Sequence, residues 1–265
     1  MKIITSKNNE IFKFLVKISK KSNFRKKTEN FIVEGKKEVD LCIHSNYNIK
    51  SLFVSEKKIL NQNIIYNDCK EKFLLSEDLM QTITYRSSSK IIAIVQKKIF
   101  DISNIKLLKN ELVLVLDEPE KPGNIGAIFR TYNALGFKNI IISNSKTEIY
   151  NPNIIRSSLG AVFCLNIFQL DTNETIKFLS KNNFKIYGSL VKSPVLIRDI
   201  DFTKRCAILM GKESSRINDS FLKNSNSTFR IPMNGKVDSL NLSVSTAIIL
   251  YEAMNQKKSI NFIKG

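Results

Sequence analysis

Three short segments in the second half of the 265-residue chain each contain a glycine close to polar side chains that could act on a ligand. The first, residues 116–137, reads as the end of a buried strand, a turn stiffened by Pro119 and Pro122, and a helix. Asn124 stands where a helix N-cap is expected, and Arg130 follows on the same helix. Because ligands of open α/β sheets bind beyond the carboxyl ends of the strands, Asn124 and Arg130 would lie where a binding site is expected. Taken alone, the segment fits a capped helix with a surface arginine equally well.

The second segment, residues 207–217, is an aliphatic strand that ends at Gly211 and is followed closely by Glu213. A glycine at this position would let backbone N–H and C=O groups approach a ligand. The Glu213 carboxylate could accept hydrogen bonds from that ligand or anchor the loop. A strand, a turn and a helix with a serine N-cap would explain the same residues.

The third segment, residues 229–254, is the end of a strand, a turn at Asn234-Gly235, and the start of the last helix at Ser239 and Asn241. Small side chains fill the first turns of that helix, so another backbone could pack closely against it. As single residues, Ser239 and Asn241 are also explained as helix caps.

Alternating strands and helices must position these three segments. A continuous aliphatic run at residues 112–116 is typical of a strand covered on both faces. Similar runs predict strands at residues 139–143, 166–170, 185–190, 207–210 and 228–231. The final helix is predicted at about residues 239–256, with an apolar set of Leu242, Ala247, Leu250 and Met254. Residues 111–265 therefore predict an α/β domain with a mostly parallel sheet.

Residues 1–100 predict a smaller α+β domain. Ile11, Phe14, Leu15 and Ile18 have the spacing of one face of an amphipathic helix, and a second helix is predicted after Gly35. Short apolar runs predict strands at residues 51–55, 64–66 and 91–95, and a helix is predicted to begin after Ser76. A polar, lysine-rich stretch at residues 101–110 predicts a linker between the two domains.

The chain is strongly basic, with 42 lysines and arginines against 24 acidic residues and a net charge of +18. Such a field attracts polyanions, either nucleic acid or an anionic membrane surface. The excess is concentrated in residues 1–37, and no segment has the apolar and aromatic face of a membrane-surface helix. We therefore predict an RNA-binding surface, with a solvated cationic face as the alternative. Its candidate residues are Lys20, Lys21, Arg25, Lys26 and Lys27.

The small number of histidines and the spacing of the cysteines exclude several kinds of catalytic and metal site. His44 is the single histidine, which excludes Ser-His-Asp triads and zinc sites built from two histidines. The four cysteines form no C-x-x-C pair, so we predict buried reduced thiols and no metal site. The chain has no apolar run long enough to span a membrane and no secretory signal at its N-terminus. We expect a soluble cytoplasmic protein.

Taken together, the three segments resemble the SpoU (TrmH) family of the SPOUT methyltransferases. The matching motifs are P-G-N-I-G-A-I-F-R-T at 122–131, M-G-K-E at 210–213 and I-P-M-N-G-K-V-D-S-L-N-L-S-V-S at 231–245. The sequence F-I-V-E-G at 31–35 and the strand at 91–95 are similar, more weakly, to the family's RNA-binding domain. The resemblance implies a knotted SPOUT-type α/β domain with a parallel sheet and a smaller α+β RNA-binding domain. It also implies a homodimer and methyl transfer from S-adenosylmethionine to a ribose 2′-hydroxyl of RNA.

The resemblance also assigns roles to individual residues. The catalytic set that it implies is Asn124, Arg130, Glu213, Ser239 and Asn241. It implies that the cofactor is held largely by main chain, around Gly211, Ile231, Met233 and Leu240.

Two questions stay open at the level of sequence. The family's usual assignment makes Arg130 the base, but a guanidinium rarely gives up its proton. A phosphate clamp that also stabilises alkoxide charge is the other interpretation of Arg130. In addition, the family's second motif commonly reads G-N/S-E-G-x-G, whereas Ser214 and Arg216 replace two of its glycines here. A catalytically weak RNA-binding or ribosome-assembly protein is therefore an alternative to an active enzyme. For an enzyme, the two-domain arrangement favours ribosomal RNA over transfer RNA as substrate.

Overall fold

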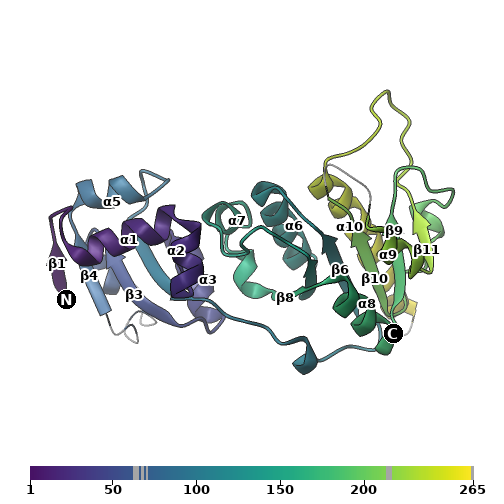
Figure 1. Ribbon diagram of the computed structural model, residues 1–265, viewed down its shortest axis with the longest axis horizontal. Coiled ribbons are helices and arrows are strands. Elements are labelled where there is room, and N and C mark those ends of the chain that lie inside the picture. The colour runs from purple at the N-terminus through teal and green to yellow at the C-terminus, as the bar shows by residue number, and fades with distance from the viewer. Residues whose placement is uncertain (62–65, 67–68, 70, 213–216, 264–265) are drawn as a thin grey trace. The chain divides into compact units, whose positions relative to one another are not determined.

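The computed structural model describes residues 1–263 apart from residues 62–65, 67–68, 70 and 213–216 (Figure 1). The chain forms two compact units. Unit 1 consists of Met1–Lys98 and Glu148–Cys164, and unit 2 consists of Ile99–Thr147 and Leu165–Gly265. Since our expectation placed all of residues 111–265 in one domain, the assignment of Glu148–Cys164 to unit 1 differs from it. Among the described residues, no helix has the length and apolar character needed to cross a bilayer.

Unit 1 is built on a five-stranded mixed sheet. Its order is β1 (Lys2–Ile4), β4 (Glu71–Leu75), β3 (Ile49–Val54), β5 (Ile91–Gln96) and β2 (Asn30–Glu34). The first three of these strands are parallel, and β5 runs antiparallel to both of its neighbours. The strand predicted at residues 64–66 lies mostly outside the described residues.

One face of this sheet is covered by the helices α1 (Glu10–Lys20), α2 (Ser22–Thr28) and α5 (Glu77–Ile83) (Figure 1). Phe12, Leu15 and Ile18 of α1 are buried against the sheet. Phe14, which we expected to face the sheet, is 37% exposed. Its ring packs edge-on against Phe24 of α2 and not against the sheet. The predicted helix is therefore confirmed, but its buried face includes Phe12 in place of Phe14.

The other face of the sheet receives α3 (Lys36–His44) together with the excursion Glu148–Cys164, which contains α7 (Pro152–Ser157) and the short helix η3 (Ala161–Cys164). The ring of Tyr150 stacks on Phe31 of β2 at 4.3 Å between centroids, and Phe163 stacks on the same ring at 5.9 Å. The Tyr150 hydroxyl is within hydrogen-bond distance of the Tyr47 hydroxyl at 3.1 Å. Aromatic packing on β2 thus explains why this excursion belongs to unit 1.

Unit 2 contains a six-stranded, fully parallel sheet. Its order is β11 (Ser227–Phe229), β9 (Lys185–Ser189), β10 (Cys206–Met210), β6 (Leu112–Asp117), β7 (Asn139–Ser143) and β8 (Asn166–Leu170). Strands β7 and β8 have the predicted bounds. Because β6 lies between β7 and β10, the order of strands along the chain reverses at β6. Such a reversal of strand order is where open parallel sheets place their ligands.

Helices cover both faces of this sheet. One face packs against α8 (Thr172–Lys181) and α9 (Asp219–Lys223), and the other against α6 (Pro122–Ala134) and α10 (Leu242–Ile263) (Figure 1). The predicted linker is partly packed: Phe100, Ile102, Ile105 and Leu107 contact the core beneath α8 and α9. A short helix, η2 (Ile102–Asn104), lies within this stretch, and another, η4 (Ile197–Asp199), follows β9.

The last helix begins later than predicted, at Leu242 rather than at Ser239. Asn241 precedes it and accepts hydrogen bonds from the backbone N–H and the hydroxyl of Ser243. Its buried side chains include Leu250, as expected, together with Thr246, Ile249 and Ala253. One further helix, α4 (Lys58–Asn61), belongs to unit 1. Residues 231–241, between β11 and α10, have no regular secondary structure.

Candidate active site

The first two segments predicted from sequence meet at the carboxyl ends of β6 and β10. Leu116 pairs with Met210 in the parallel register, so the loops that follow leave the sheet side by side. The Lys212 ammonium forms an ion pair with the Glu118 carboxylate at 2.9 Å. One strand position earlier, the Asp117 carboxylate accepts a hydrogen bond from the backbone N–H of Asn218 at 3.0 Å. These two contacts tie the ends of the second loop to the start of the first.

The third segment is held to the same edge of the sheet by backbone pairing. The N–H of Arg230 donates to Val195 O, and the N–H of Ile197 donates to Arg230 O. The Arg230 guanidinium also donates to the carbonyl of Ser193 at 2.9 Å. Residues 231–241 follow directly and lead to α10, which packs against α6 (Figure 1).

Asn124 and Asn241 are in direct contact. The side-chain N–H of Asn241 donates to the side-chain oxygen of Asn124 at 3.2 Å. Asn124 lies in the first turn of α6, whose N-cap is Lys121 and not Asn124 as expected. Asn241 directly precedes α10, and the two helices pack together. Two residues singled out in separate sequence segments are thus adjacent in space. The positive ends of two helix dipoles lie beside them, which favours negative charge at this place.

The other candidate residues differ in how they are exposed and in whether they are described. Arg130 is exposed on α6 and forms no ion pair with any described residue, so its guanidinium is available to an anionic ligand. Ser239 is exposed in the irregular stretch before α10. Glu213, like Ser214 and Arg216, lies outside the described residues. The positions proposed to surround the cofactor are Gly211, Ile231, Met233 and Leu240.

The main chain here fits a ligand held by backbone groups. Within the described part of the chain, the N–H and C=O groups of residues 231–240 form no hydrogen bonds with one another or with other residues. Most of these residues are exposed, so water can bind their backbone groups, whereas Ile231, Met233 and Leu240 are half-buried. The backbone groups of these three residues are therefore open to a ligand held by main chain.

Sequence reasoning missed Asp117. Its side chain is 4% exposed, at the end of the aliphatic strand β6. Burial raises the pKa of its carboxyl above the ordinary value, and the hydrogen bond from Asn218 N offsets only part of this effect. The signal in the sequence was an acid directly after five aliphatic residues, where a charge is costly unless it has partners. We interpret Asp117 as the anchor of Asn218, just after residues 213–216, which lie outside the described residues.

This burial predicts a pH dependence of stability. Since the folded pKa of Asp117 lies above the unfolded one, its stabilising contribution is complete below the unfolded pKa and is lost as the pH rises through the folded pKa. Asp117→Asn keeps an acceptor for Asn218 N and does not titrate. Its melting temperature relative to wild type should therefore increase between about pH 3 and pH 7.

Thermal unfolding at a series of pH values measures this difference. Asp101→Asn is the control with the opposite sign, because hydrogen bonds from Ser103 lower the pKa of that exposed carboxyl. A difference between Asp117→Asn and wild type that stays constant with pH would contradict the assignment.

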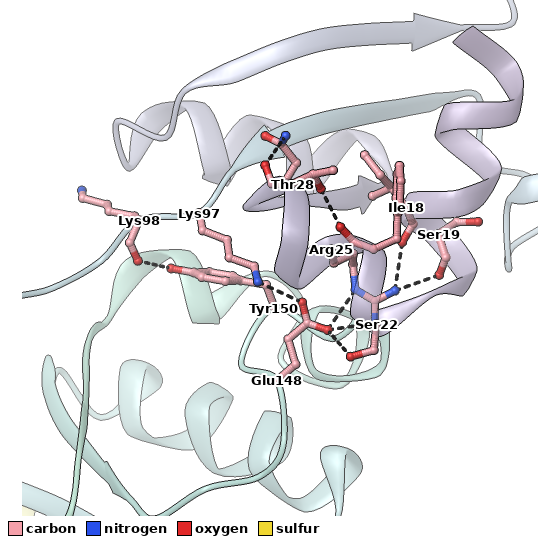
Figure 2. A network of polar contacts seen from close by, with 11 residues as sticks. Ile18, Ser19, Ser22, Arg25, Thr28, Lys97, Lys98, Glu148 and Tyr150 are labelled. Carbon is pink, nitrogen blue, oxygen red and sulfur yellow. Dashed lines mark hydrogen bonds and ion pairs between the residues drawn. The ribbon is translucent and has the colours of Figure 1, made fainter. Parts of the chain in front are cut away.

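The prediction of an RNA-binding role is wrong for one residue, Arg25. Arg25 is 4% exposed, and its guanidinium is bound by the Glu148 carboxylate at 2.9 Å and by the carbonyls of Ile18 and Ser19 (Figure 2). Its guanidinium therefore faces into unit 1, and we remove Arg25 from the candidate RNA-binding surface. The neighbouring side chains that do lie at the surface are Lys20, Lys21, Lys26 and Lys27.

Comparison with known proteins identifies the family. The model of the SpoU rRNA Methylase family matches residues 111–251, and that of an MRM3-like substrate binding domain matches residues 8–93. The 23S rRNA (guanosine(2553)-2′-O)-methyltransferase RlmP of Bacillus subtilis is 25% identical, over 95% of this chain and 98% of that protein. The 23S rRNA (uridine(2479)-2′-O)-methyltransferase of Streptomyces viridochromogenes is 24% identical, over 97% of this chain and 93% of that protein.

A solved structure extends the similarity to both units. The AdoMet-bound rRNA methyltransferase from Sinorhizobium meliloti superposes with a TM-score of 0.87 at 27% identity, covering 96% of this chain and 97% of that one. The resemblance noted in the three motifs is thereby confirmed: this chain belongs to the SpoU rRNA methylase family.

Proposed function

We propose that this chain, an RNA 2′-O-ribose methyltransferase that uses S-adenosylmethionine, acts on ribosomal RNA. Two similar proteins that align along nearly the whole chain are named as 23S ribosomal RNA enzymes. A transfer RNA (guanosine(18)-2′-O)-methyltransferase of Thermus thermophilus aligns with only 56% of this chain. The agreement of both units with the ribosomal RNA enzymes is what supports this choice of substrate.

The contact between Asn124 and Asn241 is the observation that supports the proposed site. Methyl transfer requires the attacking oxygen, the methyl carbon and the sulfur to lie in line. Fixing that alignment is worth about 7–11 kcal/mol of the barrier. The Asn124–Asn241 hydrogen bond joins the beginnings of two packed helices and so fixes the loops around it. When bound, S-adenosylmethionine supplies the activated methyl group, and we propose that main chain near Gly211, Ile231, Met233 and Leu240 holds it.

We propose that Arg130 binds the phosphate next to the target ribose and stabilises negative charge on the attacking oxygen. Its guanidinium is exposed and has no acidic partner among the described residues, as a phosphate clamp requires. The positive ends of α6 and α10 add to the same field. In this proposal the hydroxyl proton leaves to the bound phosphate or to water. Arg130 as the base is the competing interpretation.

Mapping of 2′-O-methyl groups in total RNA, with and without the gene, tests the substrate. We expect one or more ribosomal RNA positions to lose the modification and to regain it with the wild-type gene but not with Arg130→Ala. Loss confined to transfer RNA would overturn the choice of ribosomal RNA. Intact methylation in both RNAs, with no cofactor binding by calorimetry, would support the non-catalytic alternative.

We further propose that the chain forms a homodimer through α10 and that unit 2 is threaded as a knot. Val244, Ile248 and Tyr251 lie on one face of α10 and are 48%, 41% and 58% exposed. An exposed apolar stripe on a helix beside the candidate site is typical of a protein interface. Because α10 directly follows Asn241, a partner bound there would lie close to the site. A cytoplasmic location agrees with action on ribosomal RNA.

The dimer proposal predicts the effect of charge on this stripe. Ile248→Glu/Tyr251→Glu would bury two carboxylates in the interface and should weaken dimerisation about 100-fold or more, as loss of two interface hot spots does. Sedimentation velocity over a range of protein concentrations measures this. Ile99→Glu is the control, because Ile99 is 85% exposed on unit 2 and outside α10. Equal dimer constants for the double variant and this control would overturn the proposal.

A further inference from the structure

Unit 1 contains a basic pocket that lies apart from the lysines of α1 and α2. Its volume is about 450 Å³, and it is bounded by the beginning of α3, the segment after β3 with the start of α4, and the loop before β5. Five of its lining residues are cationic and two are acidic. The cations are Lys36, Lys37, Lys58, Arg86 and Lys90, and the acids are Glu38 and Glu56. The lining thus carries a net positive charge.

The first turn of α3 faces this pocket without a cap. Gly35 precedes the helix with φ of 100°, donates its N–H to Ile91 O, and provides no side chain. The first backbone N–H groups of the helix therefore receive no acceptor from an N-cap side chain. The Glu38 carboxylate lies over Gly35 in the same turn, but it is paired with Arg86, and the positive end of the helix dipole is directed at the pocket. Such a helix N-terminus is suited to an anion.

A buried hydroxyl at the same pocket has no partner. Ser89 lines the pocket and is 8% exposed, and its Oγ has no hydrogen-bond partner among the described residues. Because a buried hydroxyl without a partner is costly, this one points to a group that the chain itself does not supply. An anion bound at α3 would accept a hydrogen bond from this hydroxyl.

The ion pairs in the pocket leave an excess of positive charge, although Lys36 is paired with Asp40. The Glu38 carboxylate is held by Arg86 at 3.1 Å. Glu56 is shared between Lys58 and Lys90. Lys37 is exposed and has no acidic partner among the described residues. Both carboxylates are therefore neutralised within the pocket, and positive charge remains for a ligand.

An exposed aromatic ring next to the pocket identifies the kind of ligand. Tyr85 is 74% exposed, and the Arg156 guanidinium stacks over its ring at 4.1 Å. The backbone N–H groups of Tyr85 and Arg86 donate to the Glu34 carboxylate at 2.9 and 2.8 Å, which fixes this loop beside the start of α3. A stacking surface beside a phosphate pocket is how proteins bind single-stranded RNA.

We propose that this pocket binds a backbone phosphate of the RNA substrate, with Lys37, Lys90, Ser89 and the N-terminus of α3 as its ligands, and that Tyr85 stacks on an adjacent base. This inference rests on the proposed function, because that function makes RNA the substrate. It adds a second RNA contact in unit 1 to the one proposed for α1 and α2.

The test uses the full chain and deproteinised 23S ribosomal RNA as the probe, with binding measured over a range of salt concentrations. Lys37→Gln/Lys90→Gln should bind about tenfold more weakly, and its log–log salt slope should fall by about 0.7–0.9 for each phosphate that is no longer neutralised. Lys2→Gln/Lys7→Gln is the matched control: both side chains are exposed in unit 1, away from the pocket, and the change in charge is the same.

Ser89→Ala separates ligand binding from folding. Because the Ser89 hydroxyl has no partner among the described residues, its removal should leave the melting temperature unchanged or higher. RNA affinity should nevertheless fall about tenfold or more, as for the loss of a hydrogen bond to a charged group. Equal RNA affinity for Ser89→Ala, the double variant and the control would overturn the proposal. So would weaker binding of inorganic phosphate alone, with RNA affinity unchanged.

The outcome for the pocket is independent of the outcome for catalysis. If wild-type chain transfers no methyl group to any RNA while both pocket variants still lose RNA affinity, the proposed function fails and the pocket stands. If methyl transfer is found and the pocket variants bind RNA as the control does, the pocket fails and the proposed function stands.

Discussion

Arg130→Lys is expected to reduce methyl transfer to RNA by about 100- to 1,000-fold, the loss typical of removing one group that stabilises developing charge. Lysine keeps the positive charge but lacks the planar, bidentate guanidinium that matches a phosphate. Arg130 is exposed and has no acidic partner among the described residues, so the substitution should not unfold the chain. Affinity for S-adenosylmethionine should stay within about twofold of wild type, since the proposed cofactor residues lie in other loops.

Single-turnover methyl transfer at saturating RNA and cofactor measures this loss, and the pH profile separates the two roles of Arg130. If Arg130 were the base, lysine with its lower pKa would recover activity as the pH rises toward about 10. A clamp predicts a loss that is nearly constant with pH. Arg198→Lys is the control, because the side chain of Arg198 is 77% exposed on unit 2. Near-normal transfer by Arg130→Lys would exclude the bidentate clamp.

The sheet of unit 2 could be predicted because its signal is local. Strands β7 and β8 are continuous apolar runs with the predicted bounds, and β6 and β10 differ from their predictions by one residue. Both faces of these strands are covered, so each residue adds to the same pattern. The start of α10 was placed too early because Ser239 and Asn241 are both good cap residues. The structure shows that Asn241 has this role.

Features that depend on distant pairs were not visible in the sequence. In the sequence, Arg25 cannot be told apart from the exposed lysines around it. It is buried because it binds Glu148, which is more than a hundred residues away in the chain. The grouping of the excursion Glu148–Cys164 with unit 1 was not predicted for the same reason, since stacking of Tyr150 on Phe31 has no local pattern. In contrast, the pairing of Asn124 with Asn241 followed from the resemblance, because the family's motifs bring those positions together.

Glu148 joins two basic side chains in the interior of unit 1 (Figure 2). Its side chain is 7% exposed and binds Arg25 at 2.9 Å and Lys97 at 3.4 Å, and it also accepts a hydrogen bond from the Ser22 hydroxyl. Arg25 and Lys97 are themselves 4% and 19% exposed. Removing one partner of a buried ion pair leaves the other charge without compensation in a medium of low dielectric constant.

Glu148→Ala should therefore destabilise unit 1 by about 3–5 kcal/mol, the usual cost of an uncompensated buried charge. Glu10→Ala is the matched control. Its partner Lys13 lies one helical turn away, and the Glu10 side chain is 87% exposed, so this change should have little effect on stability. Hydrogen exchange of α2 and α7 amides in the full chain reports the loss where it occurs. Exchange at wild-type rates in Glu148→Ala would contradict the prediction.

A second variant distinguishes unpaired charge from lost packing as the cause. Arg25→Met/Glu148→Leu removes both charges and keeps apolar volume, and buried ion pairs replaced in this way are often neutral or more stable. We expect the double variant to exchange more slowly than Glu148→Ala, although Lys97 then has no carboxylate. If the double variant exchanged as fast as Glu148→Ala, packing of the Glu148 side chain, and not charge compensation, would hold the excursion Glu148–Cys164 to unit 1.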